Sequence, residues 1–267
     1  MNTSLFLQTA IEAAQLSGKL LIDSLGSEQR QQIERKQKFD FVTAVDRQSE
    51  NAIMEFLRRR HPDHGILAEE SGGSRAQQEY LWIVDPLDGT KNYIHGFPMF
   101  AVSVALQHRG DLLVGAVMDP IRSEIFHAER GAGAFLNGQP IRVSQTRDIS
   151  RCLIGTGFPF RAKHLIEPYL KVFSTLFMKV SDFRRAGSAA LDLAYVACGR
   201  FDGFWEVTLN PWDVAAGILL IQEAGGKVTD LWGGDAYMNC GHVVASNGLI
   251  HDTITEVVGG KFEGLRI

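Results

Sequence analysis

The first sixty residues carry apolar side chains at helical spacing. Between residues 5 and 21 these side chains return every three or four positions, and Gly26 follows, which predicts an amphipathic helix that ends near this glycine. Residues 27–38 are polar and are expected to form a flexible connection. Apolar spacing then predicts a second helix over about residues 44–60, because Pro62 cannot continue it.

The pattern then becomes typical of strands. Short extended segments are predicted at residues 41–43, 65–68, 81–84, 100–107, 112–118 and 124–128. The polar residues 108–111 and the Asn-Gly pair at 137–138 separate neighbouring segments, as hairpin turns do. The first half of the chain is therefore expected to begin with helices and to continue as an antiparallel meander.

After Arg151 short strands alternate with helical segments, which is the rhythm of an α/β fold. Helices are predicted at residues 165–179, 189–198, 214–224 and 249–258. We therefore expect two lobes, an α+β lobe over residues 1–147 and an α/β lobe over residues 148–267.

Composition narrows the class of protein. The 267 residues are 45% hydrophobic and 22% charged, which is typical of a globular protein with a large core. A formal net charge of -4 argues against a stand-alone nucleic-acid binder. Three distant cysteines, Cys152, Cys198 and Cys240, favour free thiols in a reducing cytosol over a disulfide framework or a zinc site. With neither a signal-peptide pattern nor a run apolar enough to span a bilayer, a cytoplasmic protein is expected.

The segment at residues 85–90, Asp-Pro-Leu-Asp-Gly-Thr, is the strongest chemical signal. Asp85 and Asp88 flank an expected turn at the end of the strand at 81–84. Carboxylates this close repel each other unless a cation neutralises them, and oxygen ligands suit Mg2+. If residues 89–91 open a helix, their amides would face an anion. Taken alone, the segment could still be an ordinary turn with a helix cap.

Further acidic residues stand where strands end or helices begin. Glu69 and Glu70 follow the strand at 65–68, and Asp213 and Asp46 precede or open helices. Each has an ordinary explanation as a solvated loop charge, a helix cap or an exposed first-turn residue. Their significance depends on whether they act together.

Together the acidic segments resemble one family. The motifs occur in the order Asp-x-Val-Thr-x-x-Asp at 40–46, Glu-Glu-Ser-Gly at 69–72, Trp-Ile-Val-Asp-Pro-Leu-Asp-Gly-Thr at 82–90 and Pro-Trp-Asp-x-Ala-Ala-Gly at 211–217. This set resembles the inositol monophosphatase family of magnesium-dependent, lithium-sensitive phosphatases, over nearly the whole chain. The resemblance implies an α/β fold, a layered αβαβα sandwich with metals between the two lobes.

The resemblance also implies a site. The metal ligands for two or three Mg2+ ions would be Glu69, Asp85, the backbone carbonyl of Leu87, Asp88 and Asp213. Thr90, hydrogen-bonded towards Asp46, would orient the attacking water, and Glu69 would assist it. Two metals can activate water and neutralise a phosphate, so that no Ser or Cys nucleophile is needed.

Substrate contacts follow from the same resemblance. The residues implied are Asp88, Gly89 and Thr90 around the phosphate, and Gly187, Ser188, Ala189 and Glu206 around the rest of the substrate. Lys36 aligns with a family lysine near the phosphate, with Arg35 or Lys38 as alternatives, and Lys91 replaces a frequent threonine. The implied reaction is hydrolysis of a small phosphate monoester, with myo-inositol 1-phosphate first. Histidinol phosphate, fructose 1,6-bisphosphate and 3′-phosphoadenosine 5′-phosphate are alternatives.

A second hypothesis concerns partners. Residues 181–192 are similar to the bacterial branch of the family, whose members also join transcription antitermination complexes. Arg184 would then contact RNA polymerase or an elongation factor, whereas Arg184 and Arg185 could instead brace a dimer or the substrate loop. The family implies a homodimer, and direct binding of nucleic acid is disfavoured by the acidic net charge. The large apolar residues Phe158, Phe160 and Trp232 are expected in the core.

Overall fold

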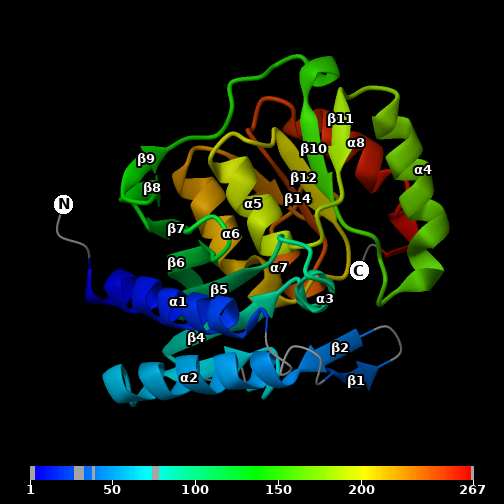
Figure 1. Ribbon diagram of the computed structural model, residues 1–267. Coiled ribbons are helices and arrows are strands. Elements are labelled where there is room, and N and C mark those ends of the chain that lie inside the picture. Colours follow the sequence, from blue (N-terminus) through cyan, green and yellow to red (C-terminus); the bar gives the residue numbers. More distant parts are fainter. Residues whose placement is uncertain (1–3, 27–32, 38–39, 74–77, 266–267) are drawn as a thin grey trace.

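The computed structural model describes residues 4–26, 33–37, 40–73 and 78–265. Helices and sheets alternate in five layers (Figure 1). Helices α1 and α2 cover one face of a seven-stranded sheet, and α5 and α6 lie between that sheet and a five-stranded one, whose other face is covered by α4 and α8. The expected αβαβα arrangement is confirmed.

The first layer holds α1 (Leu5–Ser24) and α2 (Ala44–Arg60), close to the predicted ranges. The hydroxyl of Ser4 caps α1, and the hydroxyl of Thr43 caps α2. Before α2, the strands β1 (Ile33–Gln37) and β2 (Asp40–Thr43) pair antiparallel. The expected polar connection therefore contains a strand, while residues 27–32 and 38–39 lie outside the described residues.

The large sheet has the strand order β3-β4-β5-β6-β7-β8-β9. Its strands are β3 (Gly65–Ala68), β4 (Tyr80–Asp88), β5 (Ala101–His108), β6 (Asp111–Asp119), β7 (Glu124–Glu129), β8 (Gly133–Leu136) and β9 (Gln139–Ile141). Strand β3 runs parallel to β4, and each later neighbour is antiparallel, so the predicted meander is confirmed. Both faces of the sheet are covered by helices, which explains why residues 101–106 are all buried.

The central layer consists of α5 (Ala189–Ala197) and α6 (Pro211–Glu223). The helix α6 packs closely on the large sheet, because Gly115 has no side chain: an added Cβ there would lie 2.9 Å from the Cα of Ala216. This close contact brings the first turn of α6 to the end of β4. The short α3 (Thr90–His95) follows β4 at the same end.

The second sheet has the order β11-β10-β12-β14-β13. Its strands are β10 (Leu153–Thr156), β11 (Asp182–Arg184), β12 (Gly203–Glu206), β13 (Lys227–Thr229) and β14 (Val243–Ser246). The remaining helices are α4 (Ile166–Phe177), α7 (Tyr237–Cys240), α8 (His251–Gly259) and the 3-10 turns at Ile149–Arg151, Lys163–Leu165 and Glu263–Leu265. The two outer helices differ from their predicted ends by a few residues, because helix ends are the least well determined part of a sequence pattern.

Two simpler expectations can also be compared with the structure. The three cysteines are free, and Cys152 is buried. Among the described residues, no helix combines the length and the apolar character needed to cross a bilayer.

Candidate active site

Asp85 and Asp88 lie on one side of β4 because of a bulge. Asp85 pairs with Ser103 and Asp88 with Ala101, so that three residues on β4 correspond to two on β5. In a regular strand, residues three apart face opposite sides, and the extra residue returns them to the same side. The turn expected between these residues was therefore wrong: the segment is a bulge within the strand. Hydroxyls of Ser17 and Ser49 donate to the carbonyl of Pro86 and hold the bulge against the first helix layer.

Glu69 and Asp213 reach the same place from other elements. Glu69 follows β3, whose last residue Ala68 is in register with Val84, so Glu69 lies beside Asp85. Asp213 is the third residue of α6 and accepts a hydrogen bond from the backbone N–H of Asn210 at 2.7 Å. An acidic residue at this third position of the helix is therefore also expected from helix capping.

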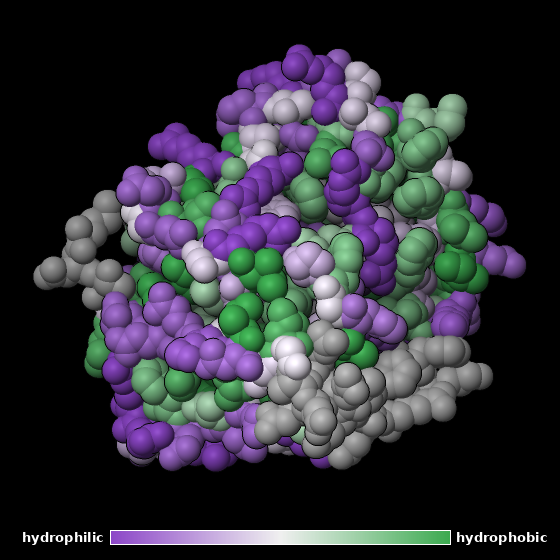
Figure 2. All heavy atoms as spheres, in the orientation of Figure 1, coloured by the Kyte–Doolittle hydropathy of each residue, from purple (hydrophilic) through white to green (hydrophobic). Residues whose placement is uncertain are grey.

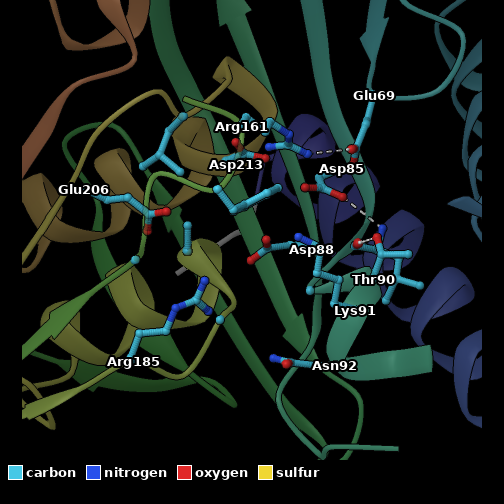
Figure 3. Close-up of a pocket in the computed structure, with 17 residues that line it drawn as sticks. Glu69, Asp85, Asp88, Thr90, Lys91, Asn92, Arg161, Arg185, Glu206 and Asp213 are labelled. Atoms are coloured by element: carbon cyan, nitrogen blue, oxygen red, sulfur yellow. Dashed lines mark hydrogen bonds and ion pairs between the residues drawn. The ribbon is translucent and has the colours of Figure 1, made fainter. Parts of the chain in front are cut away.

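We call Glu69, Asp85, Asp88 and Asp213 the acidic wall. Carboxylate oxygens of the three aspartates lie within 4.8 Å of one another. Figure 3 shows these side chains pointing into one pocket between the two sheets. The pocket encloses about 710 Å³, including the space open to solvent.

The acidic wall is electrostatically unfavourable without a cation. Burial, followed by the charge of Glu69, raises the pKa of Asp85 well above its ordinary value. Burial also raises the pKa of Asp88 to about 6, against hydrogen bonds that lower it, and that of Asp213 to about 7. Buried carboxylates with these pKa values either take up protons or bind a metal ion.

Asp46 and Thr90 form a second cluster next to the bulge. The carboxylate of Asp46 accepts hydrogen bonds from the backbone and the hydroxyl of Thr43, at 2.9 and 2.5 Å. The hydroxyl of Thr90 lies 3.2 Å from Asp46 and 3.2 Å from the carbonyl of Leu87. Asp46 is fully buried, and this burial raises its pKa to about 6. The exposed location considered for Asp46 is therefore wrong.

A glycine allows α3 to begin at the pocket. Gly89 has a φ of 92°, and an added Cβ would lie 2.9 Å from the carbonyl oxygen of Met99. The side chain of Asn92 then donates to the carbonyls of Met99 and Ala186, at 2.6 and 2.9 Å. Asn92 thereby ties α3 to the loop before α5.

That loop connects the two sheets through Asp88. Ser188 caps α5, and its hydroxyl donates to Asp88 at 2.5 Å, as does the backbone N–H of Ala190 at 2.8 Å. Gly187 and Ala189 line the pocket directly. The expected helix opening at these residues is confirmed.

Glu206 lies on the opposite side of the pocket, at the end of β12. It is buried, and burial raises its pKa to about 8, although the charge of Arg185 lowers it. An added Cβ at Gly157 would lie 2.1 Å from the Glu206 carboxylate, so only glycine leaves room for this side chain.

The remaining predicted residues have different outcomes. Lys36 belongs to β1, and its side chain lies outside the described part of the chain. Arg184 is exposed, pairs with Asp182 at 2.6 Å and does not line the pocket. The expectation of a core location was wrong for Phe158, which is 43% exposed, and for Phe160, which lines the pocket. Trp232 packs against the core of the second sheet.

Other pocket residues had not been assigned to the site. Arg161 and Arg185, which we call the arginine wall, extend into the pocket from two loops. Phe160 and Asn92 also line the pocket. Glu50 accepts hydrogen bonds from the backbone of Glu70 and Ser71 and so holds the turn after Glu69. Its position four residues after Asp46, on the same helix face, was the one signal that could have indicated it.

The layered fold and the carboxylate pocket define a class of protein. Residues 2–261 match the inositol monophosphatase family, and the chain belongs to that family.

Individual relatives agree with this assignment. The chain is 47% identical to the Nus factor SuhB of Pseudomonas aeruginosa over 246 residues, which are 90% of this chain and 91% of the relative. Its fold is similar to the crystal structure of the extragenic suppressor protein suhB from Bartonella henselae, with a TM-score of 0.91, 41% identity and coverage of 96% and 98%. It is also similar to inositol monophosphatase from Anabaena, with a TM-score of 0.85, 42% identity and coverage of 96% and 95%.

Proposed function

We propose that this protein hydrolyses a small phosphate monoester, with myo-inositol 1-phosphate as the leading candidate. The observation that carries the proposal is the cluster of Asp85, Asp88 and Asp213, whose oxygens converge within 4.8 Å beside Glu69. Membership of the inositol monophosphatase family supports the same reaction.

The pocket suits Mg2+. Its donors are carboxylate and carbonyl oxygens, which hard divalent cations prefer, and burial leaves the carboxylates in need of positive charge. We propose that two or three ions are held by Glu69, Asp85, the carbonyl of Leu87, Asp88 and Asp213. When bound, such ions activate water at neutral pH and neutralise the charge of the transferring phosphoryl group.

Residues of the chain would orient the reactants. If Thr90 donates its proton to Asp46, its lone pairs accept a hydrogen bond from the attacking water and fix its direction. Glu69 would accept the proton that this water releases. The amides of Gly89 and Thr90 would hold the phosphate, since both residues line the pocket at the start of α3.

The leaving group would lie towards the second sheet. The carboxylate of Glu206 faces the pocket and would accept hydrogen bonds from substrate hydroxyls. Gly187, Ser188 and Ala189 would shape the same region through the start of α5, and Lys36 stays a candidate phosphate contact. A polyhydroxylated leaving group fits these donors and acceptors.

A substrate panel tests the proposal. Phosphate release is measured with Mg2+, with and without Li+, from inositol 1-phosphate, histidinol phosphate, fructose 1,6-bisphosphate and 3′-phosphoadenosine 5′-phosphate. We expect lithium-sensitive hydrolysis with preference for inositol 1-phosphate. If the protein prefers another compound of the panel, that compound replaces inositol 1-phosphate as the proposed substrate. If no compound releases phosphate in the presence of Mg2+, the proposed phosphatase activity is refuted.

A second candidate function is binding to the transcription machinery in the cytoplasm. It is favoured by the relative named Nus factor SuhB, which covers 90% of this chain. Arg184 is the proposed contact, because its side chain is half-exposed at the edge of the second sheet. Binding of purified RNA polymerase and elongation factors is compared for wild type, Arg184→Ala and the control Arg130→Ala. Selective loss in Arg184→Ala supports the contact; equal binding by all three contradicts it.

We also propose a homodimer that uses α4. Figure 2 shows apolar side chains over α4 at the right edge of the molecule, and exposed apolar residues there include Ile166, Leu170, Phe177 and Met178. Light scattering should give twice the chain mass for wild type and one chain mass for Leu170→Asp. A wild-type monomer would refute the dimer.

The division into lobes 1–147 and 148–267 is likewise a proposal. It predicts that limited proteolysis cuts first near residues 142–148, between β9 and the 3-10 turn at Ile149–Arg151.

A further inference from the structure

Arg161 lies in a short loop that forms one side of the pocket mouth. The loop, residues 157–162, turns back on itself, with backbone hydrogen bonds from Phe160 to Phe158 at 2.7 Å and from Ala162 to Pro159 at 3.0 Å. The ring of Phe160 contacts two cations, with Lys91 Nζ 3.5 Å and Arg161 Cζ 4.8 Å from its centroid. The loop is thus attached to α3, and the stem of Arg161 extends over the pocket.

The guanidinium of Arg161 pairs with the acidic wall. Its Nη2 lies 3.6 Å from Oε1 of Glu69, and Figure 3 shows this contact at the edge of the carboxylate cluster. The positive charge also lowers the pKa values of Asp88 and Asp213, so its influence extends beyond Glu69 to two aspartates of the acidic wall. Arginine keeps its charge at every relevant pH, so this influence is permanent.

The two partners differ in their freedom to move. The Glu69 side chain is 10% exposed, whereas that of Arg161 is 32% exposed. Glu69 is confined by its turn, which Glu50 clamps through two backbone N–H groups. Arg161 has a long stem next to solvent, and solvent can therefore receive its guanidinium without rearrangement of the fold.

We propose that Arg161 is a built-in counter-ion that competes with divalent metal for Glu69 and sets the Mg2+ concentration at which the site fills. This inference rests on the proposed function, because it assumes that Glu69 belongs to a cation site. A divalent ion at Glu69 and a guanidinium on the same carboxylate repel each other, so the ion pair weakens as the metal binds. Without metal, the same guanidinium reduces the repulsion within the acidic wall.

Calorimetric titration of Mg2+ into the chelator-treated full chain, without substrate, tests this inference. We expect Arg161→Gln and Arg161→Met to bind Mg2+ roughly three- to tenfold more tightly than wild type, since a partly exposed pair is lost. Arg161→Met keeps the apolar stem against Phe160 and so controls for loss of packing. Arg161→Lys keeps the charge and should stay within about twofold of wild type. Arg130→Gln, which loses a surface pair with Asp111 far from the pocket, should match wild type.

A second readout uses stability. Because the neutral variants bind metal more tightly, Mg2+ should raise their melting temperatures more than that of wild type. Unchanged or weaker Mg2+ binding in both neutral variants would overturn the inference. If Arg161→Lys binds Mg2+ as much more tightly as the neutral variants do, the positive charge of Arg161 is not the cause, and the inference is overturned. If the wild type itself binds no Mg2+, the proposed function fails. If the wild type binds Mg2+ and the Arg161 variants bind it equally well, only the inference about Arg161 fails.

Discussion

The acidic wall and the arginine wall line the same pocket but are built differently. Asp85 and Asp88 lie in β4, and Asp213 in the first turn of α6, where backbone hydrogen bonds hold them. Arg161 and Arg185 extend from loops on long stems that remain partly in solvent. The three aspartates of the acidic wall are short side chains on regular elements, whereas the arginine wall consists of long, accessible side chains on connections.

This difference means that the aspartates are held in place before a ligand binds, whereas the arginines can adjust to the ligand. The carboxylates cannot move apart to relieve their repulsion, so the fold stores an electrostatic cost that a cation removes. We expect the arginines to adjust more readily when a ligand arrives, because their long side chains extend from loops and are partly exposed to solvent. Changes in the acidic wall should therefore abolish function, and changes on the opposite side should adjust it.

The largest effect is expected for Asp213→Asn. The variant loses one ligand charge in the buried cluster, and Mg2+-dependent phosphate release should fall by roughly a thousandfold or more. Steady-state assays at saturating Mg2+ measure this loss, and the exposed Asp235→Asn serves as control. Full activity of Asp213→Asn would remove this residue from the metal site.

A smaller effect is expected for Thr90→Ala, which keeps the acidic wall but removes the hydroxyl next to Asp46. Because orientation of the water is lost while substrate contacts remain, kcat should fall roughly 10- to 100-fold with little change in KM. Thr90→Ser should restore most of the rate. A change in KM alone would indicate that Thr90 only binds substrate.

On the opposite side, Glu206→Ala should mainly weaken binding. Loss of hydrogen bonds to substrate hydroxyls should raise KM roughly three- to tenfold and leave kcat within about threefold. Gly157→Ala should have a similar effect, because its Cβ would displace the Glu206 carboxylate. Equal kinetics for both variants and wild type would show that Glu206 does not contact substrate.

The smallest expected effect is on how the stability of the metal-free protein depends on pH. Burial raises the pKa of Asp213 to about 7, above its value in the unfolded chain, so the folded state binds the extra proton between about pH 4 and 7. The contribution of Asp213 to the stability of the folded state is fully present below about pH 4 and is lost as the pH rises to about 7. In chelator, Asp213→Asn should therefore melt a few degrees above wild type at pH 8, with a smaller difference at pH 5. A difference independent of pH would contradict the raised pKa, and Mg2+ should reduce the pH dependence of wild type.

Much of the acidic wall was determined by the sequence alone. Apolar spacing located α1, α2 and the strands of the large sheet, because a buried face imposes a period on the residues that cover it. Glu69, Asp85 and Asp213 stand next to such elements, where a strand end or a helix cap places a side chain with little freedom. The order of these motifs was sufficient to identify the family and the layered fold, which the structural relatives confirm.

Only the tertiary structure decided how these residues meet. The bulge that turns Asp85 and Asp88 to one side depends on pairing with β5, and the buried location of Asp46 depends on the packing of α2. Arg161 and Arg185 reach the pocket from loops that follow no hydrophobic period, so no local pattern distinguishes them from surface arginines. Local chemistry is encoded along the chain, whereas contacts between distant loops depend on how complete layers pack against one another.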